Sequence, residues 1–171
     1  MKKIRLTIGK WLLNRKITKV HRAVSAIGLQ QIKSAAIIFE ANKEENLKYV
    51  KNLIKFLPIN TLVNVVGFIS GKRRNYSYIG DKVYNYINEE DFDFFMQPKT
   101  ESIKDLINKQ FDILFVLAYD YHFPIDLISG LSKASFKVGQ SGVYEKNLDL
   151  FIETNKKDIN YLISQITHYL S

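Results

Sequence analysis

Short continuous apolar runs alternate with helical patterns along the chain from residue 33 onward. Such runs are typical of strands that are covered on both faces, and apolar residues that recur every three or four positions are typical of helices that pack on a sheet. The run at 112–118 is the clearest strand, and the run at 92–96 is the weakest. The predicted strands are 34–39, 61–69, 92–96, 112–118, 136–138 and 148–152.

The segments between these strands predict four helices. Asn42 offers an N-cap for a first helix that ends at Pro58, and Thr100 offers one for a second helix that runs through Asn108. Pro124 suits the first turn of a third helix, and 159–170 predicts a closing helix. Strands joined by helical segments need crossover connections, which link parallel strands. The sequence therefore predicts a three-layer α/β sandwich with a mainly parallel sheet of five or six strands.

The residues before this alternation have a pattern of their own. Apolar side chains follow one another there at steps of four and three, as on one side of a helix: Leu13, Ile17, Val20, Val24 and Ile27. This spacing predicts a helix over about 10–25, with Gly9 as a strained position near its start. We therefore expect a basic, amphipathic N-terminal helical extension over 1–32 and a single α/β domain over 33–171.

Charge is distributed unevenly along the chain. The sequence has 25 Lys or Arg and 17 Asp or Glu, which gives a formal net charge of +8. Nine of the basic residues and none of the acids precede Glu40, so the rest of the chain is close to neutral. Charge concentrated in this way indicates a docking surface for a polyanion.

RNA or DNA is the partner that we expect for the basic segment. The alternatives are a helix that packs on the domain and leaves a solvated basic face, a helix that lies in an anionic membrane surface with Trp11 at the interface, and a targeting peptide. A secretory signal is excluded because Arg15 and Lys16 interrupt the apolar run, whereas an organellar transit peptide would look similar. No apolar run reaches 18 residues, so no transmembrane helix is predicted.

Residues 70–91 fit the strand–helix alternation least well, and we interpret them as a long excursion with a hairpin or a short helix. A second basic cluster lies here, with Tyr76 and Tyr78 close behind it. Adjacent cations can neutralise phosphates and tyrosines can stack on bases, although a solvated loop with half-buried tyrosines is the alternative. Together the two basic segments give the predicted RNA-binding residues: Lys2, Lys3, Arg5, Lys10, Arg15, Lys16, Lys19, Arg22, Lys72, Arg73 and Arg74.

Catalytic and cofactor motifs are scarce. The absence of Cys excludes disulfides, thiolate metal sites and thiol catalysis. The stretch from Gly67 to Lys72 has three residues between its glycines where a P-loop needs four, and Arg73 stands where Ser or Thr would hold magnesium. Gly139-Gln-Ser-Gly142 lacks the dinucleotide fingerprint and is interpreted as a structural turn.

Asp120 and His122 form the strongest catalytic candidate, because they follow a central strand at its carboxyl end, where open α/β sheets bind ligands. Their aromatic neighbours indicate a packed turn, however, and no nucleophile is nearby. His21 and His168 lie far from His122 in the sequence and form no local metal pair. We therefore expect no enzyme activity, no metal, no cofactor and no small-molecule substrate.

Three short segments carry a resemblance to a known family: Phe111-Asp112 with the apolar residues after it, Phe123-Pro124, and 134–139 (ASFKVG). The chain resembles a lineage-restricted bacterial family of small α/β proteins of unassigned chemistry, over most of its length and most specifically in its C-terminal third. That family is similar to an accessory protein of the large ribosomal subunit. The motifs are mostly core and turn residues, so the resemblance implies a fold and an rRNA partner and no catalytic site. Residues 119–122 (YDYH) depart from the family's acidic or polar stretch at this point.

We therefore predict a non-catalytic, cytoplasmic RNA-binding protein that associates with the ribosome and contacts rRNA phosphates through its basic N-terminal helix. The expected partners are rRNA, of the large subunit rather than the small, and neighbouring ribosomal proteins; a membrane partner is not expected. Two alternatives come from other classes. One is a small α/β enzyme or nucleotide-binding domain with its site at the carboxyl edge of the sheet, and the other is a peripheral membrane protein held by the basic helix.

Overall fold

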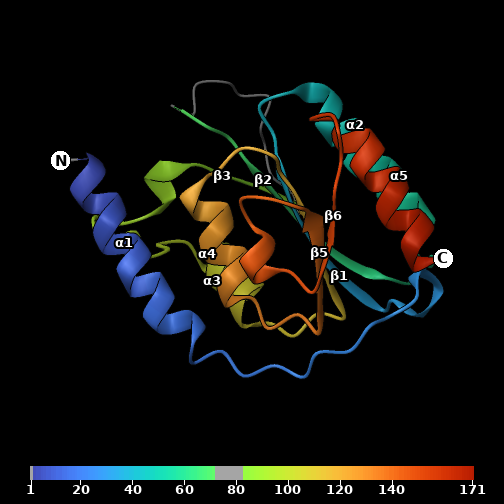
Figure 1. Cartoon of the computed structure of the whole chain (residues 1–171), viewed down its shortest axis with the longest axis horizontal. Coiled ribbons are helices and arrows are strands. Elements are labelled where there is room, and N and C mark those ends of the chain that lie inside the picture. The colour runs from blue at the N-terminus through green and yellow to red at the C-terminus, as the bar shows by residue number, and fades with distance from the viewer. Residues whose placement is uncertain (1, 72–82) are drawn as a thin grey trace.

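Six strands form one sheet in which every neighbouring pair is parallel (Figure 1). The computed structural model describes residues 2–71 and 83–171. The strand order, β3-β2-β1-β4-β5-β6, is that of doubly wound α/β proteins and confirms the predicted parallel α/β sandwich. The strands are β1 (Ser34–Glu40), β2 (Leu62–Phe68), β3 (Tyr84–Ile87), β4 (Ile113–Leu117), β5 (Phe136–Gln140) and β6 (Leu150–Ile152).

Helices cover both faces of this sheet, and an N-terminal helix lies outside one of them (Figure 1). One face is covered by α2 (Glu44–Phe56) and α5 (Ile159–Leu170), and the other by α3 (Glu101–Asn108) and α4 (Phe123–Leu131). The N-terminal helix α1 (Lys2–Ile17) packs on α4. Short 3₁₀ turns lie at Leu29–Gln31, Glu89–Asp91 and Glu145–Asn147.

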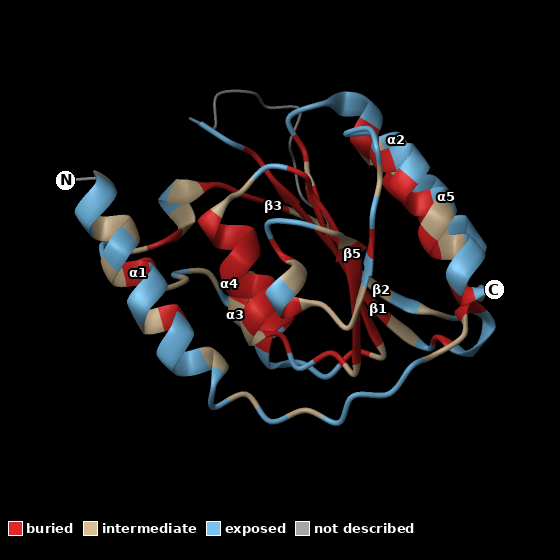
Figure 2. Ribbon diagram, in the orientation of Figure 1, coloured by how far each residue is buried: buried red, intermediate tan, exposed pale blue. Residues whose placement is uncertain are grey.

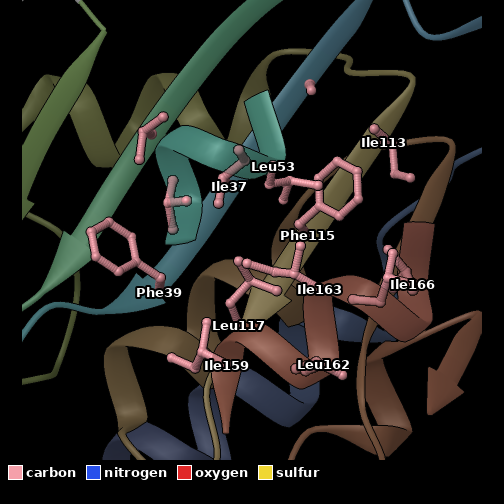
Figure 3. Close-up of a cluster of buried hydrophobic side chains, with 14 of the residues drawn as sticks. Ile37, Phe39, Leu53, Ile113, Phe115, Leu117, Ile159, Leu162, Ile163 and Ile166 are labelled. Atoms are coloured by element: carbon pink, nitrogen blue, oxygen red, sulfur yellow. The ribbon is translucent and has the colours of Figure 1, made fainter. Parts of the chain in front are cut away.

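The central strands are buried on both faces, as their continuous apolar runs predict (Figure 2). Alternate residues of β4 enter different cores because successive side chains of a strand point to opposite faces. Phe115 and Leu117 pack with α2 and α5, as Figure 3 shows, whereas Leu114 and Val116 pack with α3 and α4. Every residue of β4 is fully buried, so this strand forms the centre of the molecule.

Local sequence signals account for most helix ends. Pro124 stands in the first turn of α4, and Thr100 is the N-cap residue of α3, as predicted. The predicted N-cap of α2 was wrong by one residue, because Lys43 and not Asn42 holds that position. The Asn42 side chain instead exchanges two hydrogen bonds with the backbone of Ser70, at 2.9 and 3.1 Å, and so ties the chain after β1 to the chain after β2.

The third strand was predicted in the wrong place. The edge strand is Tyr84–Ile87, which pairs with β2, whereas 92–96 belongs to a loop closed by a single bridge between Phe92 and Pro98. Phe92 and Met96 are apolar because they anchor this loop in the core, and Met96 adopts a positive φ of 60°. The rest of the predicted excursion, 72–82, lies outside the described residues.

The N-terminal helix was also predicted too far along the chain. The helix ends at Ile17 instead of continuing to about residue 25, and the segment that follows is irregular. In Figure 1 this segment runs below the sheet and leads into β1. The amide of Ser25 donates to the carbonyl of Ser135, and Arg22 pairs with Asp149, so tertiary contacts hold these residues in an irregular path. Val24, a member of the predicted apolar stripe, is 58% exposed.

Candidate nucleic-acid interface

Helix α1 lies against α4 because a glycine on each side removes a side chain from the contact. A Cβ atom on Gly9 would lie 2.8 Å from side-chain atoms of Met96, and a Cβ on Gly130 would lie 2.7 Å from Cδ1 of Ile17. Leu13 is fully buried in the same contact. Gly9 therefore permits close packing and is not the strained start that the sequence predicted.

Two of the predicted RNA-binding arginines make contacts within the protein. Arg5 donates to the carbonyl oxygens of Phe92 and Asp93, over distances of 2.6 to 3.2 Å. Arg22 forms a two-bond ion pair with the carboxylate of Asp149, at 2.6 and 2.8 Å. In this structure Arg5 and Arg22 therefore position α1 and the segment after it.

The other predicted cations of the N-terminal segment whose side chains the structure describes lie at the surface. Lys10 rests with its Nζ atom 4.5 Å from the centre of the Tyr121 ring, and Arg15 stacks over Trp11 at 4.8 Å. These aromatic partners are neutral, so neither contact forms an ion pair. Lys3, Lys10, Arg15, Lys16 and Lys19 are exposed, Lys2 is the first residue of α1, and Lys72, Arg73 and Arg74 lie outside the described residues.

Tyr121, the ring that Lys10 contacts, is held in place by a buried hydrogen-bond network. Its hydroxyl donates to the carboxylate of Asp126 at 2.9 Å, and Asn147 donates to the other carboxylate oxygen at 2.8 Å. Burial, with the neighbouring charge of Asp126, raises the pKa of Tyr121, so this phenol stays neutral. The ring is held by this network in a fixed position under the Lys10 ammonium.

A basic groove opens where the end of α1 meets α3 and α4. Its volume is about 480 Å³. Among the described residues, four lysines and no acid line it, and the lysines are Lys16, Lys19, Lys104 and Lys133. Lys16 donates a hydrogen bond to the neutral Gln97, and Lys104 pairs with Glu101 at 2.7 Å one helical turn away. Because Glu101 is largely exposed, that pair is weak and Lys104 remains open to an anion.

The loop 92–98, which contributes to this groove, also carries two exposed aromatic rings. Phe94 and Phe95 are 54% and 53% exposed and meet edge to face, with their ring centres 5.5 Å apart. Internal hydrogen bonds between Asp93 and Gln97 and the contacts from Arg5 hold the loop that carries them. Gln97 and Pro98 of the same loop line the groove, so one short loop carries both the exposed rings and part of the groove wall.

Only part of this interface was predicted from the sequence. Lys16 and Lys19 were among the predicted residues, whereas Lys104, Lys133 and the phenylalanine pair were not. Lys104 lies in the middle of α3 and Lys133 just after α4, and packing of these helices side by side brings both lysines to α1. Their positions just after or within predicted helices on one face of the sheet were the available signal.

Asp120 and His122, the catalytic candidate considered from the sequence, have different side-chain partners in the structure. Asp120 is exposed and accepts a hydrogen bond from Lys157 at 2.5 Å, which lowers the pKa of Asp120. His122 lies instead beside Glu40, with Nε2 3.6 Å from Oε1. His122 follows β4 and Glu40 ends β1, and these two strands are parallel neighbours. The prediction from the sequence did not use this adjacency.

The described residues offer neither a metal-binding cluster nor a membrane-spanning helix. They contain no group of three or more His, Cys, Asp or Glu side chains that could hold a metal ion. In the same part of the chain, no helix combines the length and apolar character that crossing a bilayer requires.

Gly139, predicted to be structural, lies in β5, where an added Cβ would meet the Val116 carbonyl oxygen at 2.6 Å.

Comparison with known proteins gives one match. The model of a protein family, DUF6913, covers residues 5–171, and the family is described as one of unknown function. No curated protein and no solved structure matches the chain.

Proposed function

The chain belongs to DUF6913, a family of unknown function. We propose that it is a non-catalytic RNA-binding protein that associates with the ribosome. The observation that carries this proposal is the basic groove, which four lysines line and whose described lining residues include no acid. Like charges brought together in this way repel one another unless an anion occupies the space between them. A phosphodiester chain supplies such anions at regular spacing.

In this proposal the lysines contact phosphates and the aromatic rings contact bases. Lys16, Lys19, Lys104 and Lys133 would neutralise successive phosphates along the groove, and Phe94 and Phe95 would stack on bases that are not paired. Phosphate contacts hold a protein in place without distinguishing sequences, so the stacked bases and the shape of the RNA would set the preference for single-stranded or looped segments.

Arg15 and Lys10 extend the cationic surface along α1 from the groove. Both lie over aromatic rings, which limits their motion without neutralising them. A nucleic acid that follows α1 would meet these side chains after leaving the groove. The role predicted for the N-terminal helix is therefore shared, in this proposal, with Lys104 of α3 and with Lys133, which follows α4.

Ribosomal association is the finer part of the proposal, and rRNA of the large subunit is the expected target. Its basis is the resemblance carried by Phe111-Asp112, Phe123-Pro124 and 134–139. Sedimentation of cell extract through a sucrose gradient tests it. The protein should travel with large ribosomal subunits at low salt and return to the top of the gradient when salt is raised. A protein that stays at the top under all conditions, yet binds purified RNA, would restrict the proposal to RNA binding alone.

A further inference from the structure

A second cavity lies at the carboxyl edge of the sheet, away from the basic groove. The chain leaves β1 toward α2 on one face, and it leaves the neighbouring strand β4 toward α4 on the other. Adjacent strands whose connections diverge in this way open a crevice between them, and doubly wound proteins bind ligands there. In this protein the crevice has a volume of about 550 Å³, which suits a small molecule.

Glu40, the last residue of β1, provides a fixed acceptor in this crevice. Its Oε1 atom accepts hydrogen bonds from the backbone amides of Tyr119 and Asp120, at 3.2 and 2.8 Å. The Glu40 side chain is only 17% exposed. Within the described part of the chain, its other carboxylate oxygen has no hydrogen-bond partner. A half-buried carboxylate that is anchored through one oxygen leaves the second available to a donor from a ligand.

His122 places a second polar group beside this carboxylate. Its ring packs on Phe68, with the ring centres 4.7 Å apart, and its amide donates to the hydroxyl of Tyr144 at 2.8 Å. Phe68 therefore positions the ring and Tyr144 the backbone of His122, and Nε2 lies 3.6 Å from Oε1 of Glu40. Glu40 and His122 meet here only because β1 and β4 are neighbours in the sheet.

The charge around the crevice disfavours a phosphate. Among the described residues, four acids and two lysines line it, in a protein whose net charge is positive. No glycine occurs between Glu40 and the start of α2, and the first turn of that helix carries Glu44 and Glu45. A phosphate at a helix N-terminus needs open backbone amides and no competing carboxylates. The acids are Glu40, Glu45, Asp120 and Asp158, and the bases are Lys43 and Lys157.

We propose that this crevice binds a small organic amine whose ammonium group donates to the free carboxylate oxygen of Glu40. Tyr49, Tyr119 and Ile159 also line the crevice and supply aromatic and aliphatic surface for the carbon chain of such a ligand. The site does not depend on the basic groove, which lies at the junction of α1, α3 and α4. It gives the protein a ligand-binding activity in addition to the proposed RNA binding.

Nuclear magnetic resonance of the full, RNA-free chain tests the proposal with two probes of the same length. Putrescine carries two ammonium groups, and 1,4-butanediol replaces both with hydroxyls. The backbone amides of Tyr119 and Asp120 report directly on Glu40, because they donate to it. We expect putrescine to shift both signals saturably at constant ionic strength and 1,4-butanediol to leave them nearly unchanged. Equal shifts with both probes, or no saturable shift with either, would overturn the proposal.

Variants separate a specific site from general attraction of cations. Glu40→Gln keeps an oxygen for the two amides and removes the charge, and it should weaken putrescine binding at least tenfold. Glu153→Gln removes an exposed acid that does not line the crevice and should have no effect. If Glu40→Gln does not fold, Glu45→Gln at the rim should still weaken binding severalfold. Unchanged binding in the folded crevice variant, or saturable binding of adenosine monophosphate in preference to putrescine, contradicts the assigned ligand class.

Discussion

The guanidinium of Arg22 and the carboxylate of Asp149 form two hydrogen bonds, at 2.8 and 2.6 Å, across the amino ends of β5 and β6. Both side chains are largely buried, with 16% and 14% exposed. Asp149 also accepts from the amide of Lys137 at 2.9 Å, and Arg22 donates to the carbonyl of Ala134 at 3.2 Å. The pair thus joins the segment after α1 to two strands at once.

Loss of Arg22 should therefore reduce stability more than it reduces RNA binding. Arg22→Ala leaves the Asp149 carboxylate without its ionic partner, and we expect the free energy of unfolding to fall by about 2–4 kcal/mol. Arg22→Lys should recover only part of this loss, because an ammonium cannot form the paired hydrogen bonds of a guanidinium. Urea denaturation measures both effects. An unchanged unfolding midpoint in Arg22→Ala would show that the pair contributes nothing to the fold.

Neutral substitutions in the groove should weaken RNA binding and its dependence on salt. Each phosphate contact to a single strand contributes about 0.7 to the slope of log affinity against log salt. The double variant Lys19→Gln, Lys133→Gln should therefore lower that slope by about 1.4, with a matching loss of affinity for single-stranded RNA in fluorescence anisotropy. The matched control is Lys48→Gln, Lys55→Gln, which removes two exposed lysines from α2 on the opposite face. Equal losses in both double variants would contradict a role specific to the groove.

The two exposed phenylalanines should distinguish unpaired from paired RNA. Stacking of a base on an aromatic side chain is worth about 1–3 kcal/mol, so Phe94→Ala or Phe95→Ala should each weaken binding of a single-stranded oligonucleotide by roughly that amount. Duplex RNA, whose bases are already stacked, should bind the variants as well as the native chain. Phe56→Ala removes a similarly exposed ring at the end of α2 and serves as the control. If single-stranded and duplex RNA respond equally, base stacking is not part of the interface.

Lys137 should make stability depend on pH. This side chain is 2% exposed and donates to the carbonyl oxygen of Ser129 at 2.7 Å. Burial, followed by the nearby positive charge of Arg22, lowers the pKa of Lys137 to about 7, although Asp149 acts in the opposite direction. Between pH 7 and the ordinary pKa of a lysine, the unfolded chain holds a proton that the folded chain has lost, so stability rises with pH.

The comparison that isolates this effect is with Lys137→Met, which cannot titrate at this position. The free energy of unfolding of the native chain, minus that of the variant, should increase by about 2 kcal/mol between pH 7 and pH 9. Below pH 7 both states of the native chain are protonated, so the difference should level off at its most unfavourable value. A difference that stays constant over the whole range would mean that Lys137 is solvated in the folded protein.

The sequence predicted the buried centre of this fold better than its periphery. The strand Ile113–Leu117 has a continuous apolar run because both of its faces are covered, and Pro124 marks the next helix through its fixed backbone angle. The edge strand Tyr84–Ile87 has only half of its residues buried, so its pattern is weak. Phe92 and Met96 gave a false strand because a loop that anchors itself in the core also needs apolar side chains.

The candidate sites were harder to predict because each depends on contacts between distant residues. The basic N-terminal segment indicated lysines without showing that Arg22 would be used in an internal ion pair. Lys133 reaches the groove through helix packing, and Glu40 reaches His122 through strand pairing. Sequence spacing alone shows neither the helix packing that moves Lys133 nor the strand pairing that moves Glu40. A prediction of the strand order would have placed Glu40 beside β4.

The tight approach of α1 to α4 at Gly9 and Gly130 has a practical consequence for expression and truncation. Helix α4 is buried along nearly its whole length (Figure 2), so α1 acts as its outer cover. A chain shortened to begin at β1 would leave that apolar helix facing water, and such surfaces drive self-association. Purification handles and deletions at this end of the protein should therefore spare the first seventeen residues. A protein that lacks them is expected to aggregate.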